Sequence, residues 1–340
     1  MVYLFFKLIF MRTQLVYTLI SSEKDYFLEE LWVSLYSLRL FHPEATVNVL
    51  VDESTRKYME EFPELSDMIT NIVVVPVPKN YNAKQRSRIL KTSFRKYLKG
   101  SLLFLDTDTV VCKPLDEVDS LTCDIACVPE MHLPFAKMPF APYGSVKAAL
   151  GVDVHDCQYY FNTGVMYVAD SEKTHEFFQR WNEKWIYSCF ERGNSQDEPA
   201  FCVTDKEMGF VIQPLADIYN AQVAMSLKYF ADAAIVHWWH MSFIEDQSYS
   251  PYFSLQIYKE IKAAKGMTAH AEVMIRNCKQ SFTSPSIPVG EDIMYFLYSP
   301  AGKIFNRIYR EGGIASNLML KAAFLLDKLH QLVHRYHCVK

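Results

Sequence analysis

The sequence has few of the features that mark unusual classes of protein. It contains only 11 glycines and 15 prolines in 340 residues, which argues against a collagen-like, low-complexity or disordered chain. Positive charge is not in excess, because 35 lysines and arginines stand against 39 aspartates and glutamates. The chain as a whole therefore has no basic field for coating nucleic acid. Half of the residues are hydrophobic and 14% are aromatic, so a large globular core is expected.

Paired cysteine motifs and long apolar runs are also absent. None of the eight cysteines forms a CxxC pair, and several lie in apolar segments, as expected for reduced core thiols of a cytoplasmic protein. Lys7 and Arg12 interrupt the apolar start of the chain, whereas a membrane-spanning helix needs about 20 apolar residues. We therefore expect no transmembrane segment. We expect a cytoplasmic protein, with peripheral contact at the inner face of a membrane as an alternative.

Strand-like segments alternate with helix-like segments through the first two thirds of the chain. This rhythm predicts an α/β fold, in which a mostly parallel sheet carries helices on both faces. Beyond residue 248, loops rich in serine and proline separate short helices. We therefore predict one domain over residues 13–248 and a C-terminal helical extension over 249–340. The strand patterns cover 15–19, 47–51, 72–77, 101–105, 125–128 and 164–168, and the helical ones cover 27–38, 55–62, 88–98, 172–185 and 317–336.

Two aspartates, Asp106 and Asp108, directly follow the strand-like segment 101–105. In open α/β sheets ligands bind at the carboxyl ends of the strands, and two carboxylates there can hold one hard divalent cation. Without a partner, such charges are costly to bury. Two other interpretations stay open: a pair of solvated turn aspartates, and a haloacid-dehalogenase-like phosphohydrolase in which Asp106 is the nucleophile and Asp108 the general acid or base.

Several ordered motifs carry a resemblance to a known enzyme family. They are 16–22, Lys91, 106–108, 161–166 and 197–201, and Ile235-Val236-His237 follows them. Their order and spacing resemble the GT-A glycosyltransferases of the glycogenin and bacterial lipopolysaccharide galactosyl- and glucosyltransferase group, which are nucleotide-diphospho-sugar transferases. The resemblance implies a GT-A, Rossmann-like fold. It also implies metal-dependent transfer of a hexose from a nucleotide-diphosphate sugar, in particular a UDP sugar, to a saccharide or glycolipid hydroxyl, with retention of configuration.

The resemblance implies roles for individual residues. Asp106, Asp108 and His237 would bind Mn²⁺ or Mg²⁺, and the imidazole favours Mn²⁺. The metal would stabilise the leaving diphosphate. Asp197 and Glu198 would form the catalytic pair near the donor sugar. The residues expected to bind the donor are Thr18, Leu19, Ser21, Tyr26, Lys91, Asp106, Asn162, Thr163 and Gly164.

Several of these residues also have ordinary structural interpretations. His237 could be a hydrogen-bonded core histidine, and Tyr26 could be a half-buried helix residue. Asp197 and Glu198, which precede Pro199, also fit the N-terminus of a helix. The chain also departs from the family, because Glu198 stands where the family has glutamine and no phosphate-clamping lysine closely follows His237. A nucleotide-sugar-binding protein without catalysis is therefore a further alternative.

The C-terminal segment is basic. Between residues 303 and 340, seven lysines and arginines accompany two acidic residues. Lys321, Lys328 and Arg335 are spaced by seven and flank an apolar helical face. Such a helix suits an anionic membrane surface, where a lipid-linked acceptor would lie. Docking onto the catalytic domain or onto a second copy of the chain, as a homodimer, is the alternative.

Overall fold

The computed structural model describes residues 11–138, 141–223, 226–238, 255–279, 296 and 299–337. The chain divides into two compact units, Met1–Ile287 and Pro288–Lys340. The sequence pattern placed a boundary at residue 248, but two helices beyond it, α8 (Leu255–Ala264) and α9 (Ala269–Arg276), belong to the first unit. They do so because they pack against α1 (Phe27–Phe41) and add their apolar side chains to its core.

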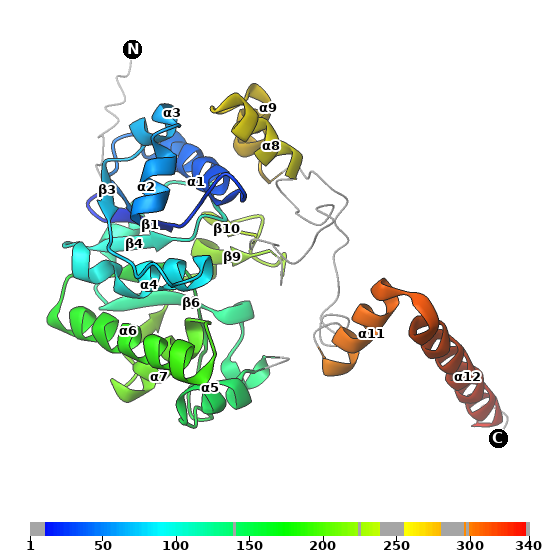
Figure 1. The fold of residues 1–340 in the computed structure, drawn as a ribbon. Helices are drawn as coiled ribbons and strands as arrows, with labels where there is room; N and C mark the ends of the chain where they lie inside the picture. Colours follow the sequence, from blue (N-terminus) through cyan, green and yellow to red (C-terminus); the bar gives the residue numbers. More distant parts are fainter. Residues whose placement is uncertain are drawn as a thin grey trace, which may run out of the picture. The chain divides into compact units, whose positions relative to one another are not determined.

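The main sheet of the first unit confirms the predicted α/β fold (Figure 1). Its strands lie in the order β3-β2-β1-β4-β7-β6-β8. β7 runs antiparallel to both of its neighbours, whereas the other neighbouring strands pair in parallel. The strands are β1 (Gln14–Leu19), β2 (Val47–Val51), β3 (Asn71–Val74), β4 (Leu102–Leu105), β6 (Ile125–Pro129), β7 (Phe161–Val168) and β8 (Ile212–Pro214).

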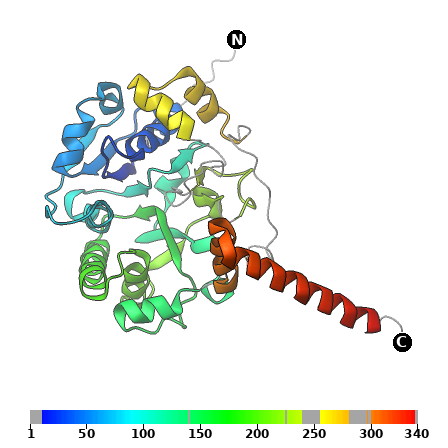
Figure 2. The same ribbon diagram turned by 45° about the vertical axis from the view of Figure 1, so that its right-hand side comes forward.

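Alternating residues of β1 separate two apolar cores, one on each face of the sheet. Leu15, Tyr17 and Leu19 pack with α1, α2 and α3, whereas Val16 and the residue directly after the strand, Ile20, pack with α4, α6 and α7. The predicted helices on both faces of the sheet are therefore confirmed (Figures 1 and 2). The bounds of these helices are α2 (Glu53–Met59), α3 (Pro63–Asp67), α4 (Ala83–Tyr97), α6 (Glu172–Arg192) and α7 (Glu198–Glu207).

Capping side chains fix the start of α4, the helix that carries Lys91. The Asn82 side chain accepts a hydrogen bond from the Gln85 backbone at 2.9 Å, and the Gln85 side chain accepts one from the Asn82 backbone, also at 2.9 Å. This reciprocal cap satisfies two backbone groups that the first helical turn leaves open. The helix therefore begins at Ala83, five residues before the start that its apolar pattern indicated.

A second sheet, in the order β5-β10-β9, lies against the α1 side of the core. Its strands are β5 (Thr109–Val111), β9 (Ala221–Gln222) and β10 (Ile235–His237). β10 pairs with β5 in antiparallel register, with His237 opposite Thr109. Because β5 begins directly after Asp108, this pairing brings a distant part of the chain beside the two aspartates.

Short helices complete the first unit, and α11 and α12 make up most of the described part of the second. Among the described residues, no helix is long and apolar enough to cross a membrane. The helix predicted over 317–336 lies within the last helix of the chain. The remaining helices are η1 (Asp116–Ser120), η2 (Glu130–His132), η3 (Phe135–Lys137), α5 (Tyr143–Leu150), η4 (Asp217–Asn220), α11 (Pro300–Glu311) and α12 (Gly313–His337).

Candidate metal centre and donor site

The turn that holds Asp106 and Asp108 is fixed by hydrogen bonds on three sides. The Asp106 N–H donates to the carbonyl of Gly164 on β7 at 2.8 Å, and the Thr109 hydroxyl donates to the Asp106 carbonyl at 2.8 Å. The Trp238 N–H donates to the Asp108 carbonyl at 3.2 Å. The turn is thus held by two different strands, which limits how far the carboxylates can move apart.

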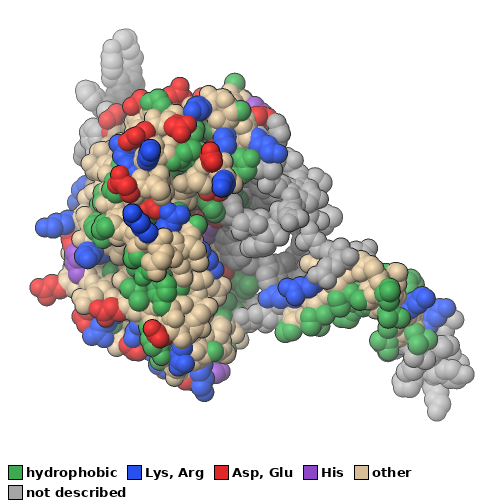
Figure 3. Space-filling view, in the orientation of Figure 1, with side chains coloured by type: hydrophobic (Ala, Val, Ile, Leu, Met, Phe, Trp, Pro, Cys, Tyr) green, Lys and Arg blue, Asp and Glu red, His purple; other side chains and the backbone are tan. Residues whose placement is uncertain are grey.

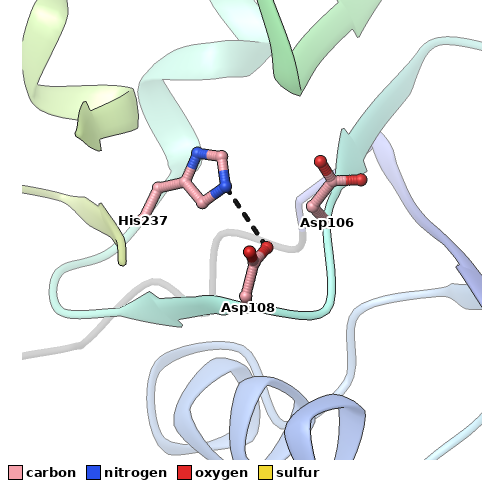
Figure 4. Close-up of side chains that lie close together, drawn as sticks. All are labelled: Asp106, Asp108 and His237. Atoms are coloured by element: carbon pink, nitrogen blue, oxygen red, sulfur yellow. Dashed lines mark ion pairs between the residues drawn. The ribbon is translucent and has the colours of Figure 1, made fainter. Parts of the chain in front are cut away.

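Asp106, Asp108 and His237 converge in space (Figure 4). One ligand atom from each residue lies within 4.8 Å of the other two, and His237 Nε2 is 3.2 Å from Asp108 Oδ1. Two carboxylates and an imidazole form a suitable donor set for Mn²⁺, and the carboxylates also suit Mg²⁺. The three residues that the sequence pattern proposed as metal ligands therefore lie where one ion can contact all of them.

A buried hydrogen-bond chain fixes the tautomer of His237. The Asn220 amide donates to Asn162 Oδ1 at 2.8 Å, so its own oxygen faces His237 Nδ1 at 3.0 Å. Nδ1 must then carry the proton and donate it, which leaves Nε2 directed toward Asp108 as the ligand atom. The Asn162 amide in turn donates to Glu130 Oε2 at 2.8 Å. The motif analysis missed Asn220 and Glu130, because neither stands in a recognisable motif.

Gly164 leaves room for the His237 ring. A Cβ placed on Gly164 would lie 2.3 Å from His237 Cε1 and 2.8 Å from its Nδ1, too close for any side chain. The Gly164 N–H also donates to Asn162 Oδ1 at 2.9 Å. The structure thus gives Asn162 and Gly164 interior contacts that support the histidine, and their predicted contact with a donor sugar stays a prediction.

Lys91 is a buried cation between two acidic residues. Its Nζ lies 3.0 and 2.9 Å from the two carboxylate oxygens of Asp106 and 3.7 Å from Asp197 Oδ2. Burial alone lowers the pKa of this amine, but the charges of Asp106 and Asp197 outweigh it and raise the pKa above its usual value. Lys91 is therefore charged, and it holds the Asp106 carboxylate in one orientation beside Asp108.

Asp197 stands at the N-cap position of α7, but its side chain does not cap the helix. Its carboxylate makes no capping hydrogen bond to α7 and instead accepts one from the Thr163 hydroxyl at 3.0 Å. Arg88 Nε lies 2.6 Å from its other oxygen. Burial raises the pKa of Asp197, but Arg88, Lys91 and the Thr163 hydroxyl more than compensate and keep it below the usual range. The predicted helix N-terminus is therefore confirmed, with Asp197 at the N-cap position and Pro199 in the first turn, but the Asp197 carboxylate belongs to the charged cluster and makes no capping bond.

Glu198, the neighbouring residue, is half-buried at the first position of α7. Burial, and to a smaller extent the charge of Asp197, raise its pKa to about 7. Near neutral pH this carboxyl is therefore partly protonated, and its protonated form can donate a hydrogen bond as the amide of a glutamine does.

A cavity of about 270 Å³ opens where β1 ends and the chain enters α1. Its walls come from the segment that follows β1, from α2 and from the start of α4. Within it, the Ser21 hydroxyl donates to Asp25 Oδ1 at 2.6 Å, and Arg86 pairs with Asp52. The lining residues are Ile20, Ser21, Ser22, Glu23, Asp25, Ser54, Tyr58, Ala83 and Arg86.

Thr18, Leu19 and Tyr26 belong to the same end of β1 but do not line this cavity. Thr18 and Leu19 are buried strand residues. The Tyr26 ring is stacked on Tyr258 at a centroid distance of 6.4 Å and has Lys262 Nζ 4.5 Å above it. These contacts favour a supporting position for Tyr26, and its stacking on a base stays a prediction.

The segment that follows Trp238 lies outside the described residues. Trp239 and His240, which follow the metal-ligand candidate His237, fall in the range 239–254. Trp238 is described and is buried in the apolar core. A tryptophan at this place in the sequence could stack on an acceptor sugar, but the buried position of Trp238 favours a core role.

No protein-family model and no curated protein matches the chain. Its fold is similar to solved glycosyltransferases. One is the galactosyltransferase LgtC in complex with donor and acceptor sugar analogues, 14% identical over 82% of this chain and 98% of that one, with a TM-score of 0.47.

Two further solved structures are similar in the same way. Mouse xyloside xylosyltransferase 1 is 14% identical over 66% of this chain and 97% of that one, with a TM-score of 0.44. The Streptococcus pneumoniae glycosyltransferase GlyE is 13% identical over 82% of this chain and 67% of that one, with a TM-score of 0.46. All three proteins are named as glycosyltransferases, and the sequence motifs resemble a group of glycosyltransferases. At this distance the likeness concerns the fold, so the function is argued below from the geometry of the site.

Proposed function

We propose that the protein is a metal-dependent glycosyltransferase that moves a hexose from a nucleotide-diphosphate sugar, UDP-linked, to a saccharide or glycolipid hydroxyl. The observation that carries this proposal is the convergence of Asp106, Asp108 and His237 at the end of β4. This edge is where the strand order reverses, between β1 and β4, and ligands of open α/β sheets bind at such switch points.

The donor set fits a divalent metal, Mn²⁺ or Mg²⁺. Asp106, Asp108 and Nε2 of His237 would hold it, and when bound it would act as a Lewis acid on the diphosphate leaving group. Lys91 orients Asp106, and Asn220 keeps the proton of His237 on Nδ1, away from the metal side. Arg88 and Lys91 add fixed positive charge near the position of a diphosphate.

We propose that the reaction retains the anomeric configuration through front-face attack, with the leaving phosphate oxygen accepting the acceptor's proton. Both carboxylate oxygens of Asp197 are engaged, one by Arg88 and the other by Thr163 and Lys91. An aspartate held in this way is a poor covalent nucleophile, because its charge is already neutralised. Asp197 and Glu198 would instead orient the donor sugar, and an NMR assignment of the product anomer tests the stereochemistry.

The donor nucleotide would bind near the cavity at the end of β1. The cavity has hydroxyl and carboxylate groups for a ribose or base, and Arg86 on α4 lies in its wall. Ser21 is the one residue among the predicted donor contacts that lines it. This placement would put the nucleoside beside α1 and the diphosphate near Asp106, on the same edge of the sheet.

A thermal-shift titration with UDP and UDP-hexoses, with and without Mn²⁺, tests the proposal without a known acceptor. A ligand at 100 times its Kd raises stability by about 2.7 kcal/mol, which is readily measured. We expect a Mn²⁺-dependent shift that Asp108→Asn abolishes and that Asp156→Asn, an exposed control aspartate, leaves intact.

Three other outcomes would each contradict the proposal. Phosphate release with Mg²⁺ from a phosphomonoester, lost in Asp106→Asn, would identify the haloacid-dehalogenase-like alternative. UDP binding without hydrolysis or transfer of any UDP-hexose would identify a non-catalytic binding protein. An unchanged UDP shift in Asp108→Asn would show that the three converging residues do not form the donor's metal site.

We propose that the second unit makes a peripheral contact with an anionic membrane surface, and that the protein acts at the cytoplasmic face. Several apolar side chains of α12 are exposed, including Leu318, Phe324 and Leu325 at 60–69%. Lys321 and Lys328 are exposed on the same helix. Figure 3 shows apolar side chains running along this unit with basic ones beside them, a combination that suits anionic headgroups.

Vesicle co-sedimentation of the full chain tests this contact. We expect binding to vesicles that contain phosphatidylserine and little binding to neutral vesicles, with Lys321→Glu plus Lys328→Glu abolishing it. Lys137→Glu plus Lys147→Glu is the matched control in the first unit. A concentration-dependent dimer without vesicle binding, lost in Leu325→Asp, would support the homodimer instead.

A further inference from the structure

Two cysteines far apart in the sequence lie in direct contact. Cys112 directly follows β5, and Cys278 is the second residue after α9. Their Sγ atoms are 3.2 Å apart. Cys112 Sγ also lies 3.5 Å from the carbonyl oxygen of Val110, to which it can donate its proton. With that proton directed toward Val110, the Cys278 thiol can donate its own proton to Cys112 Sγ, so the two sulfur atoms are in direct hydrogen-bond contact.

The backbone around the pair is well anchored on both sides. The Cys112 N–H donates to the Ala234 carbonyl at 2.7 Å, beside β10, and the Cys278 N–H donates to the Ile275 carbonyl at 3.2 Å. Lys279, the next residue, donates from Nζ to the carbonyl of Ala233 at 2.8 Å. These bonds hold the two segments in place, so a short movement of the side chains is enough to bring the sulfur atoms to bonding distance.

We propose that Cys112 and Cys278 are a redox-active pair that forms a disulfide by exchange with a low-molecular-weight disulfide of the glutathione type. The thiolate of Cys112, the more exposed of the two, attacks one sulfur of that disulfide and releases the first small thiol. The thiolate of Cys278 then attacks Sγ of Cys112 and releases the second. Two protein thiols lose two protons and two electrons, and the small disulfide is reduced to two thiols.

The cross-link would act on the same part of the molecule as the metal centre. Cys112 follows the strand that begins after Asp108, and Cys278 follows the helix that packs on α1. The closed loop would contain His237 and both of the helices that cover α1. Oxidation would therefore hold α8 and α9 against the second sheet. It would stabilise the first unit mainly because the cross-link lowers the conformational entropy of the unfolded chain.

A second thiol pair serves as an internal comparison. Cys157 and Cys202 also interact through their side chains, but both are buried, with exposed fractions of 6%. A small disulfide must reach a sulfur atom to react, so the half-buried Cys112 is expected to react first. Oxidation is therefore expected to be selective for the pair that ties β5 to α9.

Peptide mapping of the full chain after equilibration in glutathione buffers tests the proposal. We expect the oxidised protein to contain a linked pair of peptides bearing Cys112 and Cys278, and to melt roughly 3–8 °C higher than the reduced protein. Cys112→Ser and Cys278→Ser should each remove the link and the shift. Cys189→Ser, whose sulfur contacts the Gln85 amide, should retain both.

Three results would overturn the proposal. The first is full alkylation of both cysteines in glutathione buffers that oxidise other thiols of the chain. The second is linkage of either cysteine to a different partner. The third is a shift in melting temperature that survives in Cys112→Ser and in Cys278→Ser. None of these readouts depends on glycosyl transfer, so failure of this proposal and failure of the proposed function are distinguishable.

Discussion

Asp197 and Glu29 are both fully buried carboxylates, but the structure compensates them very differently. Asp197 is surrounded by Arg88, Lys91 and the Thr163 hydroxyl. Glu29, on α1, has no hydrogen-bond partner on another described residue for either carboxylate oxygen, and its nearest cation is Lys262 Nζ at 3.8 Å. Burial therefore raises the pKa of Glu29 to about 7, whereas the pKa of Asp197 is held below its usual range.

The difference shows where this molecule keeps charge in its interior. A buried charge is retained where several opposite charges and donors meet it, as at the ends of the strands. On α1 the same kind of group is only weakly compensated, so it takes up a proton near neutral pH. The charged cluster at the strand ends is therefore an organised feature of the fold, as expected for a binding site, whereas Glu29 is a cost to stability.

The largest change in the free energy of unfolding is expected from removing the carboxylate of Asp197. Asp197→Ala would leave two cations, Arg88 and Lys91, buried with less opposite charge. We expect the free energy of unfolding to fall by about 3–5 kcal/mol, the range found when one partner of a buried ion pair is removed. Urea denaturation checks this, with Asp156→Ala as an exposed control, and a loss below about 1 kcal/mol would show that the cluster is not tightly coupled.

Replacing Glu29 is expected to raise the free energy of unfolding, by less than the loss of Asp197 lowers it. The folded-state pKa of about 7 lies above the ordinary value of 4.5, so the folded protein binds the proton more tightly than the unfolded chain. The contribution of Glu29 to stability is therefore fully present below about pH 4.5, falls as the pH rises to about 7, and is constant above that. Across this window the loss is about 3 kcal/mol.

Glu29→Met removes this titration while keeping a side chain of similar length. We expect the variant to be more stable than the parent by about 2–3 kcal/mol at pH 8, with a smaller gain at pH 5. Denaturation curves at the two pH values give the comparison. An equal effect at both values would mean that packing, and not the carboxyl charge, explains the change.

The smallest change in the free energy of unfolding is expected from replacing Lys262. Its Nζ donates to the carbonyl of Glu23 at 3.0 Å and to that of Asp25, and lies over the Tyr26 ring. Lys262→Met would raise the pKa of Glu29 further and loosen the loop after β1. We expect a loss of about 1 kcal/mol at pH 8, because the lysine is partly exposed and its charge is screened. Lys262→Arg should retain part of this stability, because it keeps the positive charge. NMR titration of Glu29 measures its pKa directly.

Much of the candidate site could be predicted because it follows from local pattern. The apolar segment before Asp106 predicts a strand, and the carboxyl end of a parallel strand is where polar residues meet ligands. His237, the last residue of β10, could be proposed because the order of the motifs resembles a known family. The partners Asn220 and Glu130 could not be proposed, because they lie on separate elements and meet His237 only through the fold.

The sequence by itself determined the alternation of strands and helices and the mostly parallel sheet, because periodicity is a local property. Strand-end polarity marked Asp106 and Asp108 as candidate metal ligands, and the resemblance of the ordered motifs added His237. Only the tertiary structure decided which carboxylates are buried. On α1 the apolar pattern of Phe27, Leu31, Leu35 and Leu38 leaves Glu29 on the outer face of the helix. That face is buried because α8 and α9, more than 200 residues later in the chain, pack over it, and packing between distant segments is written in no local pattern.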